Sequence, residues 1–256
     1  MLDSDTGFPF NLPLFQNWAA LDVDTPVTFF VGENGTGKST LMEGLALAAQ
    51  SITVGAEGAG RDQTLAHVRR LGDALKLSWN KRTRKGFFLR AEDFFGYVKA
   101  QNQLKAEMQD DLARVDEEYE GRSDYAKALA RMPHAGQLGE MGRRYGPGLD
   151  ARSHGESFLA LFQARFVPGG LYLLDEPEAP LSPLRQLTLL ALMKDMVAQD
   201  AQFIIATHSP ILMAFPEARI LSFDTLPVKP VAYDTLEHVT LTRDFLANPG
   251  AFLNRL

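Results

Sequence analysis

The sequence contains no cysteine among its 256 residues. Disulfide bonds and thiolate metal ligands are therefore excluded, and the redox compartment cannot be inferred from cysteine usage. No apolar run reaches the roughly 18 residues that a helix needs to cross a bilayer. An excess of positive charge is also absent, since the formal net charge is −6. A surface that binds nucleic acid by electrostatics alone is therefore disfavoured.

The first residues, 1–6, have neither a basic segment nor an apolar core, which disfavours a secretory signal. Hydrophobic residues make up 45% of the chain and charged residues 23%, which is ordinary for a globular protein. At this length the chain fits one domain with room for a subdomain, and it can bury a sizeable core.

The most informative stretch is the glycine-rich segment 32–40, which reads Gly-Glu-Asn-Gly-Thr-Gly-Lys-Ser-Thr. It follows an apolar run at 27–31, precedes a helix-like segment at 41–48, and fits the phosphate-binding pattern G-x-x-x-x-G-K-[ST]. Glycines let such a loop wrap a phosphate so that backbone N–H groups point inward, and the helix adds the positive end of its dipole. We therefore expect a nucleoside triphosphate site.

Each residue of this loop has an expected role. Lys38 would contact the β- and γ-phosphates, and the Ser39 hydroxyl would ligate Mg²⁺. The other residues expected to bind the nucleotide are Asn34, Gly35, Thr36, Gly37 and Thr40. ATP and Mg²⁺ are the expected ligands, and a nucleotide site without an export signal predicts a cytoplasmic protein.

A second strand-like run ends in two acids. The apolar residues 171–174 are followed by Asp175 and Glu176. Buried strands of parallel sheets read as continuous apolar runs, and their carboxyl ends open on the ligand crevice. We expect Asp175 to hold Mg²⁺ through water and Glu176 to polarise the attacking water. Two acids after a strand can also form a solvated turn, but the phosphate loop in the same chain favours the functional interpretation.

The next strand-like run repeats the pattern, because the apolar residues 203–206 are followed by Thr207 and His208. A neutral imidazole at this edge can hydrogen-bond the γ-phosphate or its attacking water. A histidine after a strand is usually structural, but this strand directly follows the acidic pair. The predicted catalytic residues are therefore Glu176, His208 and Lys38.

Residues 153–156, Ser-His-Gly-Glu, precede the helix-like run 158–162. One interpretation is a capping box, in which Ser153 caps the helix and Glu156 completes the box. The other is an anion site made by the serine hydroxyl and the helix N-terminus. Since the Lys38 loop already surrounds the phosphates of its own chain, Ser153 and Gly155 would then meet the γ-phosphate held by a second copy.

Alternation of strands and helices in the second half predicts a parallel sheet covered on both faces. In the first half, residues 8–31 indicate β-structure, and 75–79 with 86–90 indicate a hairpin with a basic tip. From Glu92 to about Arg131 the composition favours helices, with breaks at 132–134 and 146–148. The remaining expected elements are a helix after residue 151, a strand at 171–175, a helix at 184–198, a strand at 202–206 and a short strand near 220–223.

Taken in order, these motifs resemble those of the ATP-binding-cassette (ABC) ATPase superfamily. More narrowly they are similar to its soluble branch, which includes SMC, Rad50, RecF and OLD-type ATPases and small stand-alone ATPases labelled "AAA family". The resemblance covers about residues 8–225: segment 32–40 matches Walker A, 171–176 matches Walker B with its catalytic glutamate, and His208 matches the switch histidine. Residues 152–156, Arg-Ser-His-Gly-Glu, match the signature motif in a variant form, where transporters have Leu-Ser-Gly-Gly-Gln.

Further positions follow from the resemblance. Ser182 replaces the aspartate of the D-loop, and Glu92 stands where the Q-loop has glutamine. An aromatic residue that stacks on adenine is expected before the first strand, where Phe10 and Phe15 are both candidates.

The resemblance implies one ABC-type α/β domain over 1–256, with a mostly parallel sheet flanked by helices, an antiparallel β region, and a short helical subdomain at about 92–145. SMC and Rad50 proteins carry a long coiled coil at this subdomain. Here we expect at most two short helices, because Gly121 and Pro133 break a segment that would span only about 80 Å even as one helix. The resemblance also implies a head-to-tail homodimer that clamps two ATP molecules between Walker A of one subunit and Ser153 of the other.

Three functions are open for an ATPase of this kind. The first is a soluble clamp or motor that hydrolyses ATP to act on DNA or on a partner protein. The second is the nucleotide-binding subunit of a transporter, which the chain length fits but the signature and D-loop do not. The third is a slow nucleotide-gated binding switch. Candidate contacts to DNA phosphates are Arg69, Arg70, Lys81, Arg82, Arg84, Lys85, Arg143 and Arg144.

Overall fold

The computed structural model describes residues 7–18, 20–54, 59–145 and 154–254. The chain divides into two compact units, one made of residues 1–91 and 166–256 and the other of residues 92–165. The first unit contains the sheet, and the second is helical.

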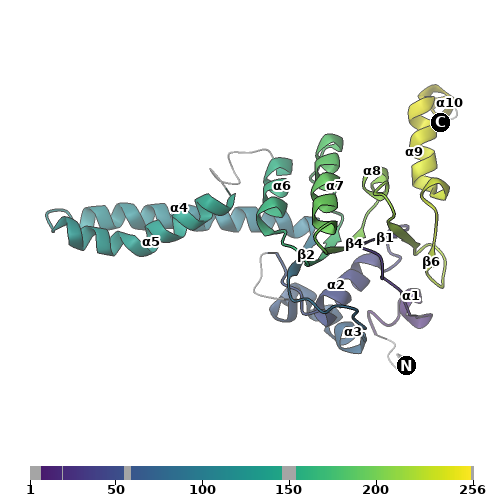
Figure 1. The fold of residues 1–256 in the computed structure, drawn as a ribbon, viewed down its shortest axis with the longest axis horizontal. Coiled ribbons are helices and arrows are strands. Elements are labelled where there is room, and N and C mark those ends of the chain that lie inside the picture. Colours follow the sequence, from purple (N-terminus) through teal and green to yellow (C-terminus); the bar gives the residue numbers. More distant parts are fainter. Residues whose placement is uncertain (1–6, 19, 55–58, 146–153, 255–256) are drawn as a thin grey trace. The chain divides into compact units, whose positions relative to one another are not determined.

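A six-stranded sheet forms within the described residues, with the strand order β2-β3-β4-β1-β5-β6 (Figure 1). Its strands are β1 Val27–Val31, β2 Gly86–Arg90, β3 Leu171–Asp175, β4 Gln202–Ala206, β5 Arg219–Ser222 and β6 Lys229–Pro230. Strands β1 to β5 pair with one another in parallel, and β6 pairs with β5 in antiparallel orientation. The predicted mostly parallel α/β fold is confirmed, and the antiparallel pairing lies between β5 and β6.

Helices cover both faces of this sheet (Figure 1). On one side lie α2, Lys38–Ala48, and α3, Arg69–Ala74, and on the other lie α7, Pro183–Val197, and α8, Pro210–Met213. The strands between them are mostly apolar because both of their faces are buried, as all five residues of β1 and of β3 are. The first unit also contains α1 Pro13–Gln16, η1 Ala59–Arg61, η2 Gln63–Val68, η3 Tyr233–Thr235, α9 Glu237–Ala247 and α10 Pro249–Leu253.

Helices α2 and α3 approach each other at two glycines. A Cβ added at Gly44 would lie 2.8 Å from Leu71 Cδ2, and one added at Gly72 would lie 2.5 Å from Leu47 Cβ. The absence of both side chains therefore lets α3 pack closely on the helix that follows the phosphate loop.

The predictions for the first 90 residues are partly wrong. Residues 8–18 and 20–26 form no strand, and the first of these segments contains the short helix α1, whose Leu14 and Phe15 are buried in the core. The predicted hairpin is also absent, because residues 75–85 form no strand and β2 pairs in parallel with β3, Gly86 opposite Leu171. Local alternation could not identify a partner strand that comes so much later in the chain.

The helical unit contains α4 Ala91–Glu118, α5 Asp124–Tyr145 and α6 His154–Arg165. The expectation of short helices is wrong, since α4 has 28 residues and α5 has 22. Gly121, with φ +80°, lies in the turn between them as predicted, but α5 continues through Pro133. A proline inside a helix costs about 3 kcal/mol, and the long flanking segments rich in good helix formers offset that cost.

Aromatic side chains form the core of the helical unit. Phe94 of α4 packs edge-to-face on Phe158 of α6 with 4.6 Å between ring centroids, and Phe158 packs in the same way on Phe162 at 4.7 Å. Arg165 lies over the ring of Tyr97 and donates a hydrogen bond to its hydroxyl. No helix in the described part of the chain is both long and apolar enough to cross a membrane.

Candidate nucleotide site

The predicted phosphate loop connects β1 to α2. Gly32, Gly35 and Gly37 have φ values of +142°, +85° and +94°, which side-chain-bearing residues rarely adopt. Gly37 is also the N-cap of α2, so the helix begins at Lys38. The glycines of the motif thus stand at the positions where the loop backbone has a positive φ.

Lys38 is buried within its own loop. Its ammonium donates hydrogen bonds to the carbonyl oxygens of Gly32 (2.6 Å) and Glu33 (2.9 Å). Burial lowers the pKa of Lys38, whereas the negative charges of Asp224, Asp175, Glu176 and Glu33 oppose that shift. The lysine is therefore held by loop carbonyls in a predominantly acidic surrounding, in which it can exchange those carbonyls for phosphate oxygens.

The carboxyl ends of β1, β3 and β4 lie in register. Ala206 of β4 pairs with Phe30 of β1 on one side and with Asp175 of β3 on the other. Asp175 is a buried carboxylate at the end of its strand, and Glu176 directly after it is exposed with φ +52°. The sheet therefore brings the acidic pair to the same edge as the phosphate loop.

His208 follows β4 at this edge. Its backbone N–H donates to Glu178 Oε1 at 2.7 Å, which ties the loop after β4 to the loop after β3. Its Nε2 atom is buried and has no hydrogen-bond partner among the described residues. A buried ring nitrogen of this kind can bind a phosphate oxygen or a water molecule held by one.

Sequence reasoning missed Glu178. Burial raises the pKa of its carboxyl group, against hydrogen bonds from the Thr207 side chain and the His208 backbone. Nearby, burial and the charge of His208 lower the pKa of His238, whose ring centroid lies 6.4 Å from that of His208. Glu178 lies three residues after Asp175, the last residue of β3, and this position was a signal in the sequence. Only tertiary contacts, however, distinguish Glu178 from a surface acid.

Sequence reasoning also missed Asp224. Its Oδ1 accepts the backbone N–H of Glu33 at 2.7 Å, so it contacts the phosphate loop directly. It follows the strand β5 as Asp175 ends β3, and the same pattern of an apolar strand followed by an acid could have identified it.

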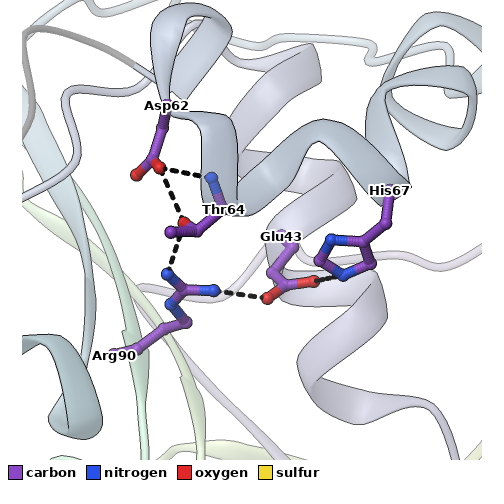
Figure 2. A network of polar contacts seen from close by, with 5 residues as sticks. All are labelled: Glu43, Asp62, Thr64, His67 and Arg90. Atoms are coloured by element: carbon purple, nitrogen blue, oxygen red, sulfur yellow. Dashed lines mark hydrogen bonds and ion pairs between the residues drawn. The ribbon is translucent and has the colours of Figure 1, made fainter.

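A buried polar network holds α2 from the side (Figure 2). Arg90, the last residue of β2, donates to Glu43 Oε1 of α2 and to Thr64 Oγ1 of η2, both at 2.8 Å. His67 Nε2 lies 3.1 Å from the second oxygen of Glu43, and Thr64 donates to Asp62. Hydrogen bonds from Thr64 and the charge of Arg90 outweigh burial and lower the pKa of Asp62. Arg90 pairs with Asp175 in the β-ladder, so the network borders the acidic pair.

Other predicted residues lie elsewhere. Ser153 is outside the described residues, and Gly155 is buried in the first turn of α6 in the helical unit. Ser182 is the exposed N-cap of α7, and Glu92 is exposed in the first turn of α4. The capping box that depends on Ser153 therefore stays a prediction, as does its contact with a second copy.

The adenine-stacking prediction is wrong for both candidates. Phe10 is 6% exposed and Phe15 only 2%, and both belong to the apolar core. Neither ring offers a free face to a base, because apolar side chains this close to the sheet are more stable when buried.

The predicted basic tip is partly neutralised. Lys81 forms an ion pair with Asp200 at 3.3 Å, and the Lys85 ammonium donates to the carbonyl oxygen of Pro168 at 3.4 Å. Elsewhere, the Arg70 guanidinium lies over the Phe10 ring. DNA contact by these side chains stays a prediction.

Residues 157–214 match the family model AAA_21, described as "AAA domain, putative AbiEii toxin, Type IV TA system". The matched segment contains the acidic pair, Glu178 and His208. No protein with a curated function matches the chain significantly.

Several solved structures are similar to parts or most of the chain. The Smc head domain of Pyrococcus furiosus, bound to the C-terminal domain of ScpA, is 13% identical over 86% of this chain and 93% of its own, with a TM-score of 0.40. The cbiO1 protein of Clostridium perfringens, part of the ABC transporter complex cbiONQ, is 15% identical over 90% of this chain and 88% of its own, also with a TM-score of 0.40. The SMC head domain of Thermotoga maritima is 26% identical with a TM-score of 0.26, but the match spans only 33% of this chain and 35% of that one.

The family match and the motifs agree. The matched segment contains the predicted acidic pair and His208, and the fold around it is a mostly parallel sheet flanked by helices.

Proposed function

We propose that this protein binds and hydrolyses Mg²⁺–ATP and dimerises head-to-tail when ATP is bound. The observation that carries the proposal is the meeting of the phosphate loop, the acidic pair and His208 at one edge of the sheet. Many folds share a phosphate loop, but its combination with a strand-end Asp-Glu pair and a histidine after the next strand offers a metal ligand, a base for water and a contact to the γ-phosphate.

Each of the residues at this edge has a separate role in binding or hydrolysis. Backbone N–H groups of the loop and Lys38 bind the phosphates, and Glu176 orients and deprotonates the attacking water. His208 offers Nε2 to the γ-phosphate or to that water, while Glu178 holds the backbone of the histidine in position. The exposed Glu176 can reach solvent, as a residue that activates water must.

Ser39 and Asp175 would hold the metal ion. No cluster of three or more His, Cys, Asp or Glu side chains suited to a metal occurs within the described ranges. The hydroxyl of Ser39 and the carboxylate of Asp175 fit Mg²⁺, which keeps several waters and binds one or two protein groups together with substrate phosphates. When bound, the ion would neutralise charge on the phosphates.

The Glu176→Gln variant tests the proposal. It retains the binding residues but lacks the base, so it should bind ATP, hydrolyse it at least about a hundredfold more slowly, and accumulate as a dimer. Gel filtration with light scattering, in ATP and Mg²⁺, measures the dimer.

Two controls accompany this experiment. The same variant without nucleotide should be monomeric, and Lys38→Ala should neither bind ATP nor dimerise. A Glu176→Gln protein that binds ATP but stays monomeric would contradict the composite site and leave ATP binding intact.

The target of the ATPase is proposed to be a partner protein. A second candidate function is the nucleotide-gated switch, which would bind its partner when ATP is bound and hydrolyse ATP only to reset. Steady-state ATP hydrolysis, measured with and without a partner captured by Glu176→Gln, separates the switch from a motor, because a switch turns over slowly even when its partner is bound.

DNA and a transporter permease are the remaining alternatives. Binding to double-stranded DNA should be salt-sensitive and lost when Lys81, Arg82, Arg84 and Lys85 are all replaced by alanine. Co-purification with a membrane permease would favour the transporter subunit instead.

A further inference from the structure

One peptide group of the phosphate loop is held from both sides. The carbonyl oxygen of Gly32 accepts a hydrogen bond from the Lys38 ammonium at 2.6 Å. The N–H group of Glu33, which belongs to the same peptide, donates to Asp224 Oδ1 at 2.7 Å. Because a trans peptide is planar and its C=O and N–H point in opposite directions, Asp224 and Lys38 lie on opposite sides of it.

Asp224 is itself held in place by the end of β5. The Ser222 hydroxyl donates to Asp224 Oδ2 and accepts the Asp224 N–H, both at 3.3 Å. Phe223 donates its N–H to Val31 at 2.8 Å and packs its ring on Phe30, so the residue before Asp224 is anchored to β1. The carboxylate is therefore presented to the loop by two packed strands.

Gly32 leaves room for this carboxylate. A Cβ at Gly32 would lie 2.9 Å from Asp224 Oδ1, and the φ of +142° is one that only glycine adopts readily. The first glycine of the motif thus has a specific use here: it lets Asp224 approach the loop backbone.

The electrostatic surroundings of Lys38 agree with this geometry. The acids that face it are Asp224 after β5, Asp175 and Glu176 after β3, and Glu33 in the loop, and Asp224 has the largest effect of the four in opposing the shift caused by burial. A carboxylate, an amide and an ammonium joined by two short hydrogen bonds polarise one another, which strengthens both bonds.

We propose that Asp224 is a positioning residue of the nucleotide site, which acts through the Gly32–Glu33 peptide to hold the loop and Lys38 ready for a triphosphate. The inference rests on the proposed function, since it assigns a residue to the same site. A purely structural role, in which Asp224 only ends β5, predicts a loss of stability without an effect on Lys38.

The first experiment uses the protein without nucleotide. Lysine side chains are labelled with ¹⁵N, the Lys38 ammonium signal is assigned with Lys38→Arg, and the exchange of its protons with water is followed by NMR at one fixed pH. In Asp224→Asn these protons should exchange faster than in the unchanged protein, because the Gly32–Glu33 peptide that accepts one of them is no longer held by a carboxylate. The matched control is Asp200→Asn, which removes a remote exposed carboxylate, and it should leave this exchange rate unchanged.

The second experiment measures the Kd of ATP by calorimetry. Asp224→Ala, which removes the acceptor, should weaken binding about tenfold or more. Asp224→Asn keeps an acceptor for the Glu33 N–H, so its defect should be smaller than that of Asp224→Ala. Circular dichroism and thermal melting establish that each variant is folded.

The outcomes separate the two proposals. If the unchanged protein does not bind ATP, the proposed function fails, while the exchange of the Lys38 ammonium protons still tests the Asp224–Lys38 coupling. If Asp224→Asn and Asp200→Asn give the same exchange rate for these protons, or if Asp224→Ala binds ATP as tightly as the unchanged protein, the positioning role is overturned.

Discussion

At the scale of single residues, the site depends on acids that sit just beyond strand ends. Glu178 ties the loop after β3 to the backbone of His208, and Asp224 ties the end of β5 to the phosphate loop. Asp175 and Glu176 were predicted from the apolar run before them, whereas these two were not. Their roles come from hydrogen bonds to residues remote in sequence, which a local pattern does not contain.

Glu178 should make stability depend on pH. Burial raises the pKa of its carboxyl in the folded state above the ordinary value, so the folded protein holds this proton more tightly than the unfolded chain. The free energy of unfolding should therefore fall as pH rises from the ordinary glutamate pKa, about 4.3, through the raised folded value. Glu178→Gln does not titrate and keeps an acceptor for His208, so its melting temperature relative to the unchanged protein should rise with pH over this window.

Scanning calorimetry at a series of pH values measures the difference between the two proteins. The exposed residue Glu217, changed to Gln, is the control for the loss of a carboxylate elsewhere. A difference that stays flat or falls with rising pH would contradict the assigned direction of the shift.

At the scale of elements, α2 is held by buried polar contacts as well as by apolar packing. The Arg90–Glu43 pair joins β2 to α2 at 2.8 Å with both side chains less than a tenth exposed (Figure 2). The glycines Gly44 and Gly72 let α3 pack closely against the same helix. Since α2 begins with Lys38, these contacts fix the start of this helix relative to the sheet.

Removing one partner of this ion pair should be costly. Arg90→Met leaves Glu43 buried without its main counter-charge, and the expected loss is about 3–5 kcal/mol in the free energy of unfolding. The double variant Arg90→Met with Glu43→Met removes both charges and should recover most of that loss. Urea denaturation measures both, and a double variant at least as unstable as Arg90→Met would contradict a role based on charge compensation.

Elements near the motifs were predictable, and those far from them less so. The strands at 171–175 and 202–206 were predicted at their observed bounds, because an apolar run bounded by polar residues determines both ends. The strand at 86–90 was also found, but its partner was wrong, because parallel pairing joins residues that are distant in sequence. Helix α5 shows the reverse case. Pro133 is a local signal that predicts a helix break, but the helix continues through it because the flanking residues favour helix.

At the scale of the whole molecule, one chain supplies one copy of each motif. The phosphate loop, acidic pair and His208 lie in the sheet-containing unit, and residues 154–165 lie in α6 of the helical unit. A composite site of the proposed kind is made from two chains, so two differently defective chains should complement each other.

Mixing Lys38→Ala with Ser153→Arg tests this directly. Each variant alone should be inactive, because every site that it could form with its own copy lacks one half. In the mixture, a heterodimer contains one intact site out of two, so ATPase activity should return to at most about half of that of the unchanged protein. As a control, Lys38→Ala mixed with Glu176→Gln should stay inactive, since both defects lie in the same half-site. No activity in the first mixture, with both variants folded, would argue against the head-to-tail arrangement.

The sequence by itself determined the phosphate loop, the acidic pair and the histidine, because each follows an apolar strand and is encoded within a few neighbouring residues. Glycines at positions that need a positive φ mark the loop for the same local reason. Only the tertiary structure decided that Phe10 and Phe15 are core residues and that Asp224 contacts the loop. The physical reason is that burial and hydrogen bonding depend on which strands become neighbours, and Asp224 meets a peptide 191 residues earlier in the chain only once β5 has paired with β1.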